Sequence, residues 1–200
     1  MNWLLPGIPL IRIVHDFVSA RVSVPVLNHS VRVGFLSRLI AEREQIEIPE
    51  DIIWAAALLH DVGTAVGQSS PQRFEVVGAN AATELLAARS ELSGAQLQEV
   101  WDAIALHTSP HIAEARGGLT RLIRLGVLMD FGKDVLPDAA EVRTGLERAW
   151  PRADIERTLA HAVVQQALQV PEKAPVASWP NNLYVAHLRN PHHTGINPAF

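Results

Sequence analysis

A histidine and an aspartate, His60 and Asp61, stand side by side at the end of the apolar run Trp54–Leu59. Such groups are expensive to bury unless they are paired, hydrogen-bonded or bound to a metal. Imidazole and carboxylate together are ligands that borderline or hard divalent cations accept. The alternative is an ordinary polar helix end, with Asp61 bonding loop amides and Gly63 ending the helix. The pair alone does not decide between these two interpretations.

Other polar residues fall near the ends of apolar helical segments elsewhere in the chain. His29 opens one such segment, His107 closes another, and Asp130 lies at the apolar end of a fourth. Two histidines and two aspartates can hold one divalent metal and leave a position for water, as in catalytic sites. Each residue also has a structural explanation: Asp130 could pair with Arg121 or Arg124. His107 could be a satisfied core histidine, but the conjunction favours a metal site.

Hydrophobic periodicity predicts that the elements carrying these residues are all helices. No convincing alternating segment longer than four residues indicates a strand. The expected helices cover residues 10–18, 27–45, 52–60, 74–89, 95–106, 119–131, 139–150 and 152–168, the last opened by Pro151. The segment from Ile52 to His60 is apolar nearly all round, which places it at the centre of a helical bundle.

The composition indicates one domain with a sizeable core. The chain has 200 residues, of which 48% are hydrophobic. We expect a single helical domain over residues 1–170 and a Pro/Asn-rich tail over 171–200 that is extended or partly ordered. Because there is no cysteine, disulfides and thiolate ligands are excluded, and a metal must use nitrogen and oxygen ligands.

Charge and the N-terminal segment bear on partners and location. Only 19% of residues are charged and the net charge is -4, which argues against nucleic acid or a membrane surface as a partner. The apolar start lacks a positive leader, and Pro6 and Pro9 interrupt it, so it predicts neither a signal peptide nor a membrane span. We expect a cytoplasmic protein with a small-molecule substrate. Trp150 and Trp179 look exposed and hint at a homo-oligomer contact.

The order of these residues resembles the HD-domain superfamily of metal-dependent phosphohydrolases and their relatives, which is all-helical. Four segments are similar to its cyanamide-hydratase-like branch. They are residues 28–33 (NHSVRV), 58–64 (LLHDVGT), 73–79 (RFEVVGA) and 103–108 (AIALHT). The resemblance covers about residues 25–134, a little over half of the chain, and implies an HD-type bundle around one buried metal.

The resemblance implies one divalent metal held by four residues, which are His29, His60, Asp61 and Asp130. Zinc is favoured, with iron and manganese as alternatives. Dinuclear members have a further histidine where this chain has Phe74 and Glu75, and its absence argues against a di-iron oxygenase. His107 alone makes a weak second site. His111 could restore a pair on one helix face, but Pro110 is expected to end that helix.

The resemblance implies a metal-dependent hydratase or hydrolase in which the cation lowers the pKa of a bound water. The branch implies hydration of a small nitrile, and the wider superfamily implies hydrolysis of a nucleotide or other phosphate ester. Few cations are available for phosphate, namely Arg32, Arg73, Arg116 and Lys133. Nitrile hydration is therefore favoured. A third alternative is a non-catalytic binding module in which the metal only holds the helices together.

We expect Asp61, Glu75 and His107 to act in catalysis, the latter two by moving protons or orienting water. Glu75 could instead pair with Arg73 or Arg32. Substrate contacts are expected from Arg32, Thr64 and Phe74, although Arg32 could also hold a carboxylate ligand. The segments 63–73 and 108–118 are the expected lid and specificity elements.

Two further groups are capable of binding metal but are not expected to do so. His15 and Asp16 lack the small-residue run and the glycine that accompany the first pair, and indicate a helix surface or packing pair. The histidines of the tail are His187, His192 and His193. They have no helical register to preorganise them, so a solvated tail or an arm over a neighbouring subunit is expected.

Overall fold

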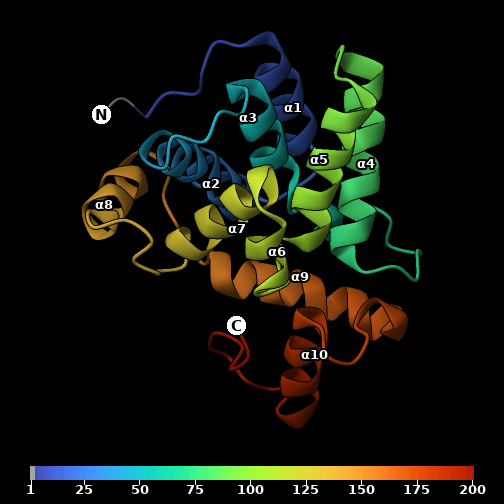
Figure 1. Cartoon of the computed structure of the whole chain (residues 1–200). Coiled ribbons are helices and arrows are strands. Elements are labelled where there is room, and N and C mark those ends of the chain that lie inside the picture. The colour runs from blue at the N-terminus through green and yellow to red at the C-terminus, as the bar shows by residue number, and fades with distance from the viewer. Residues whose placement is uncertain (1–2) are drawn as a thin grey trace.

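The computed structural model describes residues 3–200, and this range contains ten α-helices, two short 3-10 helices and no strand (Figure 1). The all-α prediction is therefore confirmed. The helices are α1 (Pro9–Ser19), α2 (Val24–Arg43), α3 (Glu50–Leu59), α4 (Phe74–Arg89), α5 (Gly94–Leu106), α6 (Ile112–Arg116), α7 (Gly118–Asp130), α8 (Ala139–Ala149), α9 (Ile155–Gln169) and α10 (Trp179–Arg189). The 3-10 helices are η1 (Val62–Thr64) and η2 (Pro171–Lys173).

The eight helices expected from periodicity are all present, with clear shifts at two starts: α2 begins at Val24, before the predicted residue 27, and α9 begins later than predicted. Helix α9 begins at Ile155, whereas the sequence pattern placed its start at Pro151–Arg152. The intervening Ala153 has a positive φ of 48°, which the right-handed helix does not allow, so the helix can form only beyond it. The short α6 and the two 3-10 helices were not predicted.

Helix α3 lies at the centre of the bundle because its apolar residues surround it on all sides. All residues from Ile52 to Leu59 are buried, and α3 packs against α1, α2, α5 and α7. Helices α2 and α7 also pack closely against each other. A Cβ on Gly126 would lie 2.3 Å from Ser37 Oγ, so glycine allows this approach. The pairing brings the end of α7 beside the start of α2.

The C-terminal part of the chain lies across one end of this bundle. Helix α9 runs below helices α1 to α8 in Figure 1, and α10 packs against α9. The expected extended tail is thus wrong for residues 179–189, which form a helix. Ser178 caps it by accepting a hydrogen bond from the Asn181 amide at 3.2 Å, and Pro180 fits its first turn. The division at residue 170 stays a prediction.

The two tryptophans expected to be exposed are half-buried instead. Trp150 donates a hydrogen bond from Nε1 to the carbonyl oxygen of Trp3 at 2.9 Å, and Trp179 packs on Phe74. They give no support to the predicted oligomer contact. Across residues 3–200, none of the helices combines the length and the hydrophobicity that crossing a bilayer requires.

Candidate metal centre

Three elements bring the predicted ligands His29, His60 and Asp61 together inside the bundle. His29 lies on α2, His60 follows the last residue of α3, and Asp61 precedes η1. One ligand atom from each lies within 4.8 Å of the other two, and all three residues are buried. His107, which follows α5, is the fourth member of this cluster, with its ring centre 4.9 Å from that of His60.

Each histidine of the cluster uses its outer ring nitrogen, Nδ1, for a hydrogen bond. The Nδ1 atom of His60 lies 2.7 Å from the carbonyl oxygen of Ala57, and that of His107 lies 2.7 Å from the carbonyl oxygen of Ile104. A carbonyl oxygen can only accept, so Nδ1 carries the proton in both rings. In the neutral imidazole, Nε2 then presents a lone pair, and both Nε2 atoms face Asp61.

The Nε2 atoms of the histidines and the carboxylate oxygens of Asp61 are close together, but Asp61 accepts no well-formed hydrogen bond from these rings. Nε2 of His60 lies 3.2 Å from Nε2 of His29 and 3.1 Å from Asp61 Oδ2. His107 Nε2 lies 3.5 Å from Asp61 Oδ1. Among residues 3–200, neither oxygen of this buried carboxylate has a partner in hydrogen-bonding geometry. Facing lone pairs and an unbonded buried carboxylate are both unfavourable.

A divalent cation removes this conflict, and the donor set fits one. Two imidazole nitrogens and a carboxylate oxygen, at mutual distances of 3.1 to 3.6 Å, are ligands of the kind that zinc, iron and manganese accept. The backbone carbonyl behind His60 orients its ring as outer partners of metal-bound histidines do. His29, His60 and Asp61 are therefore the residues that would hold a metal.

The electrostatics of the cluster favour a positive charge at its centre. Burial disfavours ionisation of Asp61, but attraction to His60 and His107 holds its pKa well below the ordinary value. Burial lowers the pKa of His29 despite its contact with Asp130. For His60 burial also acts to lower the pKa, yet the charge of Asp61 outweighs it and the pKa is raised. Asp61 is thus anionic, and His29 is neutral and able to donate its lone pair.

Asp130, the fourth predicted ligand, lies behind His29 rather than beside Asp61. Its Oδ2 is 2.7 Å from His29 Nδ1, and Arg32 donates to both of its oxygens, from Nε at 2.7 Å and from Nη2 at 2.8 Å. Burial acts to raise the pKa of Asp130, but the hydrogen bonds and the charges of Arg32 and His29 together outweigh it and hold this pKa well below its ordinary value. In this geometry Asp130 orients His29. Its role as a direct ligand stays a prediction.

Arg32 binds the carboxylate of Asp130, which was the alternative to its predicted contact with the substrate. Its side chain is fully buried, and Nη1 also donates to the carbonyl oxygen of Trp150 at 3.0 Å. It therefore holds the carboxylate of Asp130, and it does not line the cavity described below. The partners that the sequence suggested for Asp130 are engaged elsewhere: Arg121 pairs with Glu44 and Arg124 pairs with Glu114.

Glu75 likewise takes the structural alternative, an ion pair with Arg73. Arg73 Nη2 donates to Glu75 Oε1 at 2.5 Å, and the hydroxyl of Thr108 donates to the same oxygen at 2.6 Å. Glu75 is completely buried, whereas Arg73 and Thr108 line the cavity described below. Glu75 therefore fixes two wall residues in place, and its predicted role in proton transfer finds no support in this geometry.

The two remaining predicted substrate contacts serve to bring α4 onto the site. The hydroxyl of Thr64 turns back to donate to the carbonyl oxygen of Asp61 at 2.7 Å. Phe74 is 1% exposed and packs its ring 5.8 Å from the ring of His107. A Cβ on Gly63 would lie 1.9 Å from the carbonyl oxygen of Phe74, so only glycine permits this approach.

The expected lid segments are tied down in part by residues that the sequence did not single out. Gln166 Nε2 donates to the carbonyl oxygens of Gly63 and Thr64, both at 2.9 Å. The buried Lys173 donates from Nζ to the carbonyl oxygen of Gly67 at 3.0 Å. No local pattern could have revealed these contacts, because they span about a hundred residues. His111 is exposed at the start of α6 and takes no part in the cluster.

A cavity of about 770 Å³ opens over the cluster. His29, His60, Asp61 and His107 lie at its base, and helix α7 with the segment before α6 forms one side. Residues 177–179, Asn182 and Phe200, from the C-terminal part of the chain, form another side. Three of the four predicted ligands, His29, His60 and Asp61, therefore face a space that is large enough for a small-molecule ligand.

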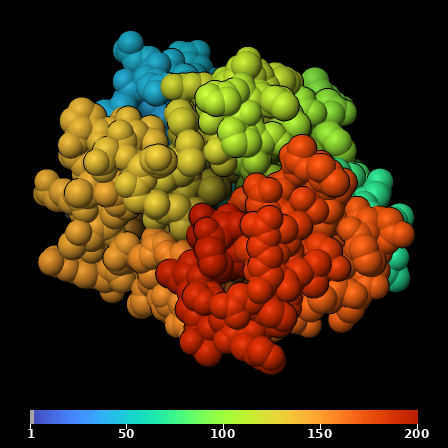
Figure 2. Space-filling view, turned by 90° about the horizontal axis from the view of Figure 1, so that it is seen from below, coloured from blue at the N-terminus to red at the C-terminus, as the bar shows by residue number. Residues whose placement is uncertain are grey.

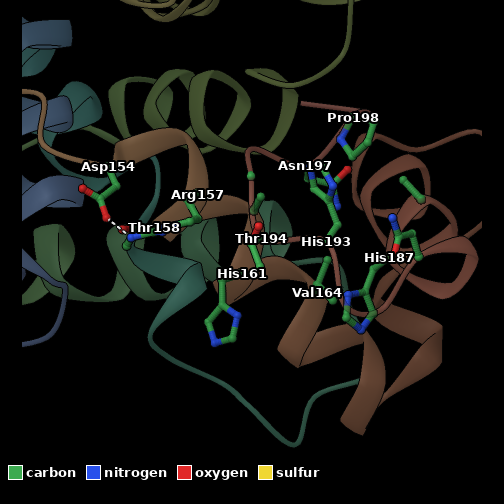
Figure 3. A pocket seen from close by; sticks show the side chains of 14 residues that line it. Asp154, Arg157, Thr158, His161, Val164, His187, His193, Thr194, Asn197 and Pro198 are labelled. Atoms are coloured by element: carbon green, nitrogen blue, oxygen red, sulfur yellow. Dashed lines mark hydrogen bonds and ion pairs between the residues drawn. The ribbon is translucent and has the colours of Figure 1, made fainter.

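The other groups that could bind metal are not organised for it. His15 and Asp16 form a pair at 3.6 Å on α1 with Asp16 largely exposed, as predicted. A second cavity, of about 520 Å³, lies between α9, α10 and the segment after α10 (Figure 3). His161 and His187 stand well apart in it, and His193 bonds the Ile196 carbonyl at 2.9 Å. Within residues 3–200, only His29, His60 and Asp61 form a group that could hold a metal ion.

Comparison with protein families agrees with this centre. The model of the HD domain matches residues 26–148, which is more than half of the chain. The chain belongs to the HD-domain family. A search of curated proteins finds no significant match. HD-domain proteins bind divalent metals and are generally metal-dependent phosphohydrolases, so the family supports a metal-dependent hydrolase, with the metal at the His29, His60 and Asp61 group. The predicted superfamily is confirmed.

Proposed function

We propose that this HD-domain protein is a metal-dependent enzyme that adds water to a small nitrile, in the manner of cyanamide hydratases. One observation carries the proposal. The buried carboxylate of Asp61 lies among three inward-facing imidazole nitrogens, without hydrogen-bond partners among the described residues, at the base of an open cavity. A metal that served only to hold helices together would not need access to a cavity of this size.

The chemistry divides between the metal and the side chains around it. A divalent cation at His29, His60 and Asp61 supplies Lewis acidity, which lowers the pKa of water and polarises the substrate. Asp61 contributes the negative charge of the site. Asp130 and Arg32, behind His29, keep that ring in one orientation.

His107 is the residue placed to move a proton. Its Nδ1 donates to the Ile104 carbonyl, so Nε2 is free to accept the proton that water loses. The resulting imidazolium would lie 3.5 Å from Asp61 Oδ1, which stabilises it. As the water oxygen forms its bond to the nitrile carbon, one carbon–nitrogen π bond breaks and its electron pair takes up a proton at nitrogen. Transfer of the second water proton from oxygen to nitrogen completes the amide, or urea from cyanamide.

The charges in the cavity wall support an uncharged substrate. Arg73 is neutralised by Glu75 and Arg124 by Glu114, so neither brings a free positive charge to the cavity. A phosphate ester carries up to two negative charges and needs several unpaired donors. Lys133, which is exposed at the cavity edge, is a single cation on a flexible stem.

Hydrolysis of a phosphate ester is the second candidate, and the cavity itself favours it. A volume of about 770 Å³ far exceeds what cyanamide needs, and three cationic residues line it, namely Arg73, Arg124 and Lys133. If a phosphate displaces Glu75 or Glu114 from their partners, the donors become available. The general activity of the family points in the same direction.

Assays of the full chain loaded with zinc, iron or manganese test the proposal. We expect urea from cyanamide, and we expect His107→Gln to lower kcat by about 100-fold or more while metal content stays unchanged. His15→Gln, a histidine change on α1, is the matched control and should leave both unchanged. Phosphate release from nucleoside monophosphates without urea would replace the proposal with the second candidate. A metal-loaded chain active on neither substrate class would favour the non-catalytic module.

A further inference from the structure

The cavity over the metal centre is bordered by aromatic rings from two separate parts of the chain. Within the family match, Phe131 lies with its ring centre 4.8 Å from that of His29. Phe74 lies 5.8 Å from His107. Phe131 therefore extends the base of the cavity beside His29, and Phe74 packs beside His107 behind the cavity wall.

Two further rings, Trp179 and Phe200, come from the C-terminal part, which the family match does not include. Their ring centres are 5.7 Å apart. Phe200 lies 5.0 Å from Phe131, and Trp179 lies 6.2 Å from Phe74, all in edge-to-face contacts. The two C-terminal rings thus bridge the two phenyl rings of the HD domain.

Together these contacts close a circuit. The ring of His60 lies 5.0 Å from that of His29 and 4.9 Å from that of His107, and so joins the two ends of the series. Seven rings, three of histidine and four of phenylalanine or tryptophan, thus form seven consecutive contacts. Six of them line the cavity and Phe74 lies behind the wall. One arc of the circuit consists of metal-binding or proton-transferring histidines, and the other arc is wholly uncharged.

Local hydrogen bonds hold the two C-terminal rings in place. The cap at Ser178 fixes the first turn of α10, where Trp179 lies. Asn197 donates from Nδ2 to the carbonyl oxygen of Leu183 at 3.0 Å, and its own carbonyl accepts from the Phe200 amide at 2.9 Å. This side of the cavity is therefore arranged before a ligand binds, which reduces the entropy cost of recognition. Figure 2 shows the C-terminal segment, in red, beside the yellow and light-green surface of the HD domain.

We propose that Trp179 and Phe200 form a specificity wall that receives a planar, uncharged, unsaturated group of the substrate, aryl or heteroaryl, while the reacting carbon faces the metal centre. The preferred substrate is then an aromatic nitrile, with cyanamide as a smaller and poorer one, so the inference rests on the proposed function. Aromatic faces and edges favour such a group through offset or edge-to-face contacts. The cavity, at about 770 Å³, lies within the range that holds ligands of this size.

Binding of the reaction products separates this inference from the reaction. With zinc-loaded full chain, calorimetry should show that benzamide binds at least about tenfold more tightly than acetamide. Trp179→Ala and Phe200→Ala should each weaken benzamide binding by about three- to tenfold and leave acetamide binding unchanged. Trp179→Phe, which keeps a ring, should bind benzamide within about threefold of the original chain. If Trp179→Phe retains benzamide binding, the weaker binding of Trp179→Ala is due to the missing ring and not to a loss of the fold.

The matched control is Trp101→Ala. Trp101 is a half-buried tryptophan on α5 that donates to Asn80 Oδ1 at 2.8 Å and does not line this cavity. It should leave benzamide binding unchanged. Equal binding of benzamide and acetamide, or equal loss in the Trp101 and Trp179 variants, would overturn the specificity wall. If the chain forms urea from cyanamide but does not prefer benzamide, the specificity wall is disproved and the proposed reaction stands. If benzamide binding depends on Trp179 but no nitrile is hydrated, the proposed reaction is disproved and the specificity wall stands.

Discussion

Two cavities of this molecule contain three histidines each, and only one of them is built to hold a metal. In the cavity over the metal centre the rings of His29, His60 and His107 are buried, and the outer nitrogen of each has an acceptor 2.7 Å away. In the cavity between α9 and α10 the histidines are half-buried or exposed. Only one of these, His193, forms a side-chain hydrogen bond with the described residues.

The difference lies in what holds the rings, and not in the number of histidines. The rings of the metal centre sit at the ends of long helices whose packing fixes their backbone, and a second partner fixes each ring. His187 and His193 lie on α10 and on the segment after it, with solvent on one side (Figure 3). Exposed side chains must lose rotamer freedom to converge on a cation, and this cost opposes binding.

Removal of His60 is expected to have the largest effect. His60→Ala takes away one of three convergent ligands and leaves Asp61 and His29 without the geometry of the site, so metal should fall from about one ion per chain to near none. His187→Ala is the control in the other cavity and should retain the ion. Metal analysis after dialysis, with circular dichroism to confirm helix content, measures both. Equal metal content in the two variants would remove the distinction between the cavities.

Arg32 gives the largest expected effect on stability. Arg32→Met leaves the carboxylate of Asp130 buried without its bidentate partner, which should cost about 3 to 5 kcal/mol in the free energy of unfolding. Arg121→Met breaks the partly exposed pair with Glu44 and should cost less than about 1 kcal/mol. Urea unfolding of the two variants measures the contrast. A cost for Arg32→Met as small as that for Arg121→Met would show that the outer partners do not hold the centre rigid.

Much of this centre could be predicted from the chain, because its signals are local. The apolar segment that ends in His60 and Asp61 identifies a buried helix and its costly polar end without reference to any other residue. Helix α4 was predicted with the bounds that the structure has, since Phe74 begins and Arg89 ends a clear helical period. The bundle follows from such segments, because each apolar face must be covered.

The roles of individual side chains could not be predicted, because they depend on contacts between distant residues. Arg32 and Asp130 are 98 positions apart, and periodicity does not reveal which of several arginines meets a given carboxylate. Glu75 had two candidate partners in the sequence, and only the fold shows that it bonds Arg73. Trp179 was expected at an oligomer contact and Phe200 gave no signal, because a proline- and asparagine-rich segment carries too little periodicity to show what it packs on.

Asp130 tests whether a buried hydrogen-bond partner behind a histidine, which the exposed histidines lack, strengthens metal binding. If Asp130 acts through His29, Asp130→Asn should weaken metal binding by about 10- to 100-fold, the range for an outer partner. A direct ligand would instead lose metal as completely as His60→Ala. Competition with a chelator of known affinity measures the dissociation constant. Asp16→Asn, on the exposed pair of α1, is the control and should leave it unchanged.

The smallest expected effect concerns the link between the C-terminal part and the loop after Asp61. Lys173 follows α9 and donates to the carbonyl oxygens of Gly67 and Gln72, at 3.0 and 3.3 Å, so it ties the C-terminal part to the loop after Asp61. Burial lowers the pKa of Lys173, which shows that its charge is held at some cost, and removing it recovers part of that cost.

The net loss for Lys173→Met should therefore be modest, about 1 to 2 kcal/mol in urea unfolding. Lys133→Met, at an exposed lysine, should change stability by less than about 0.5 kcal/mol. Hydrogen exchange should become faster in residues 65–72 of the Lys173 variant, while His60 and its neighbours on α3 stay protected. If exchange at α3 rises equally, the loop and the metal centre form one cooperative unit. The rigidity of the centre would then depend on the C-terminal part as well as on its own hydrogen bonds.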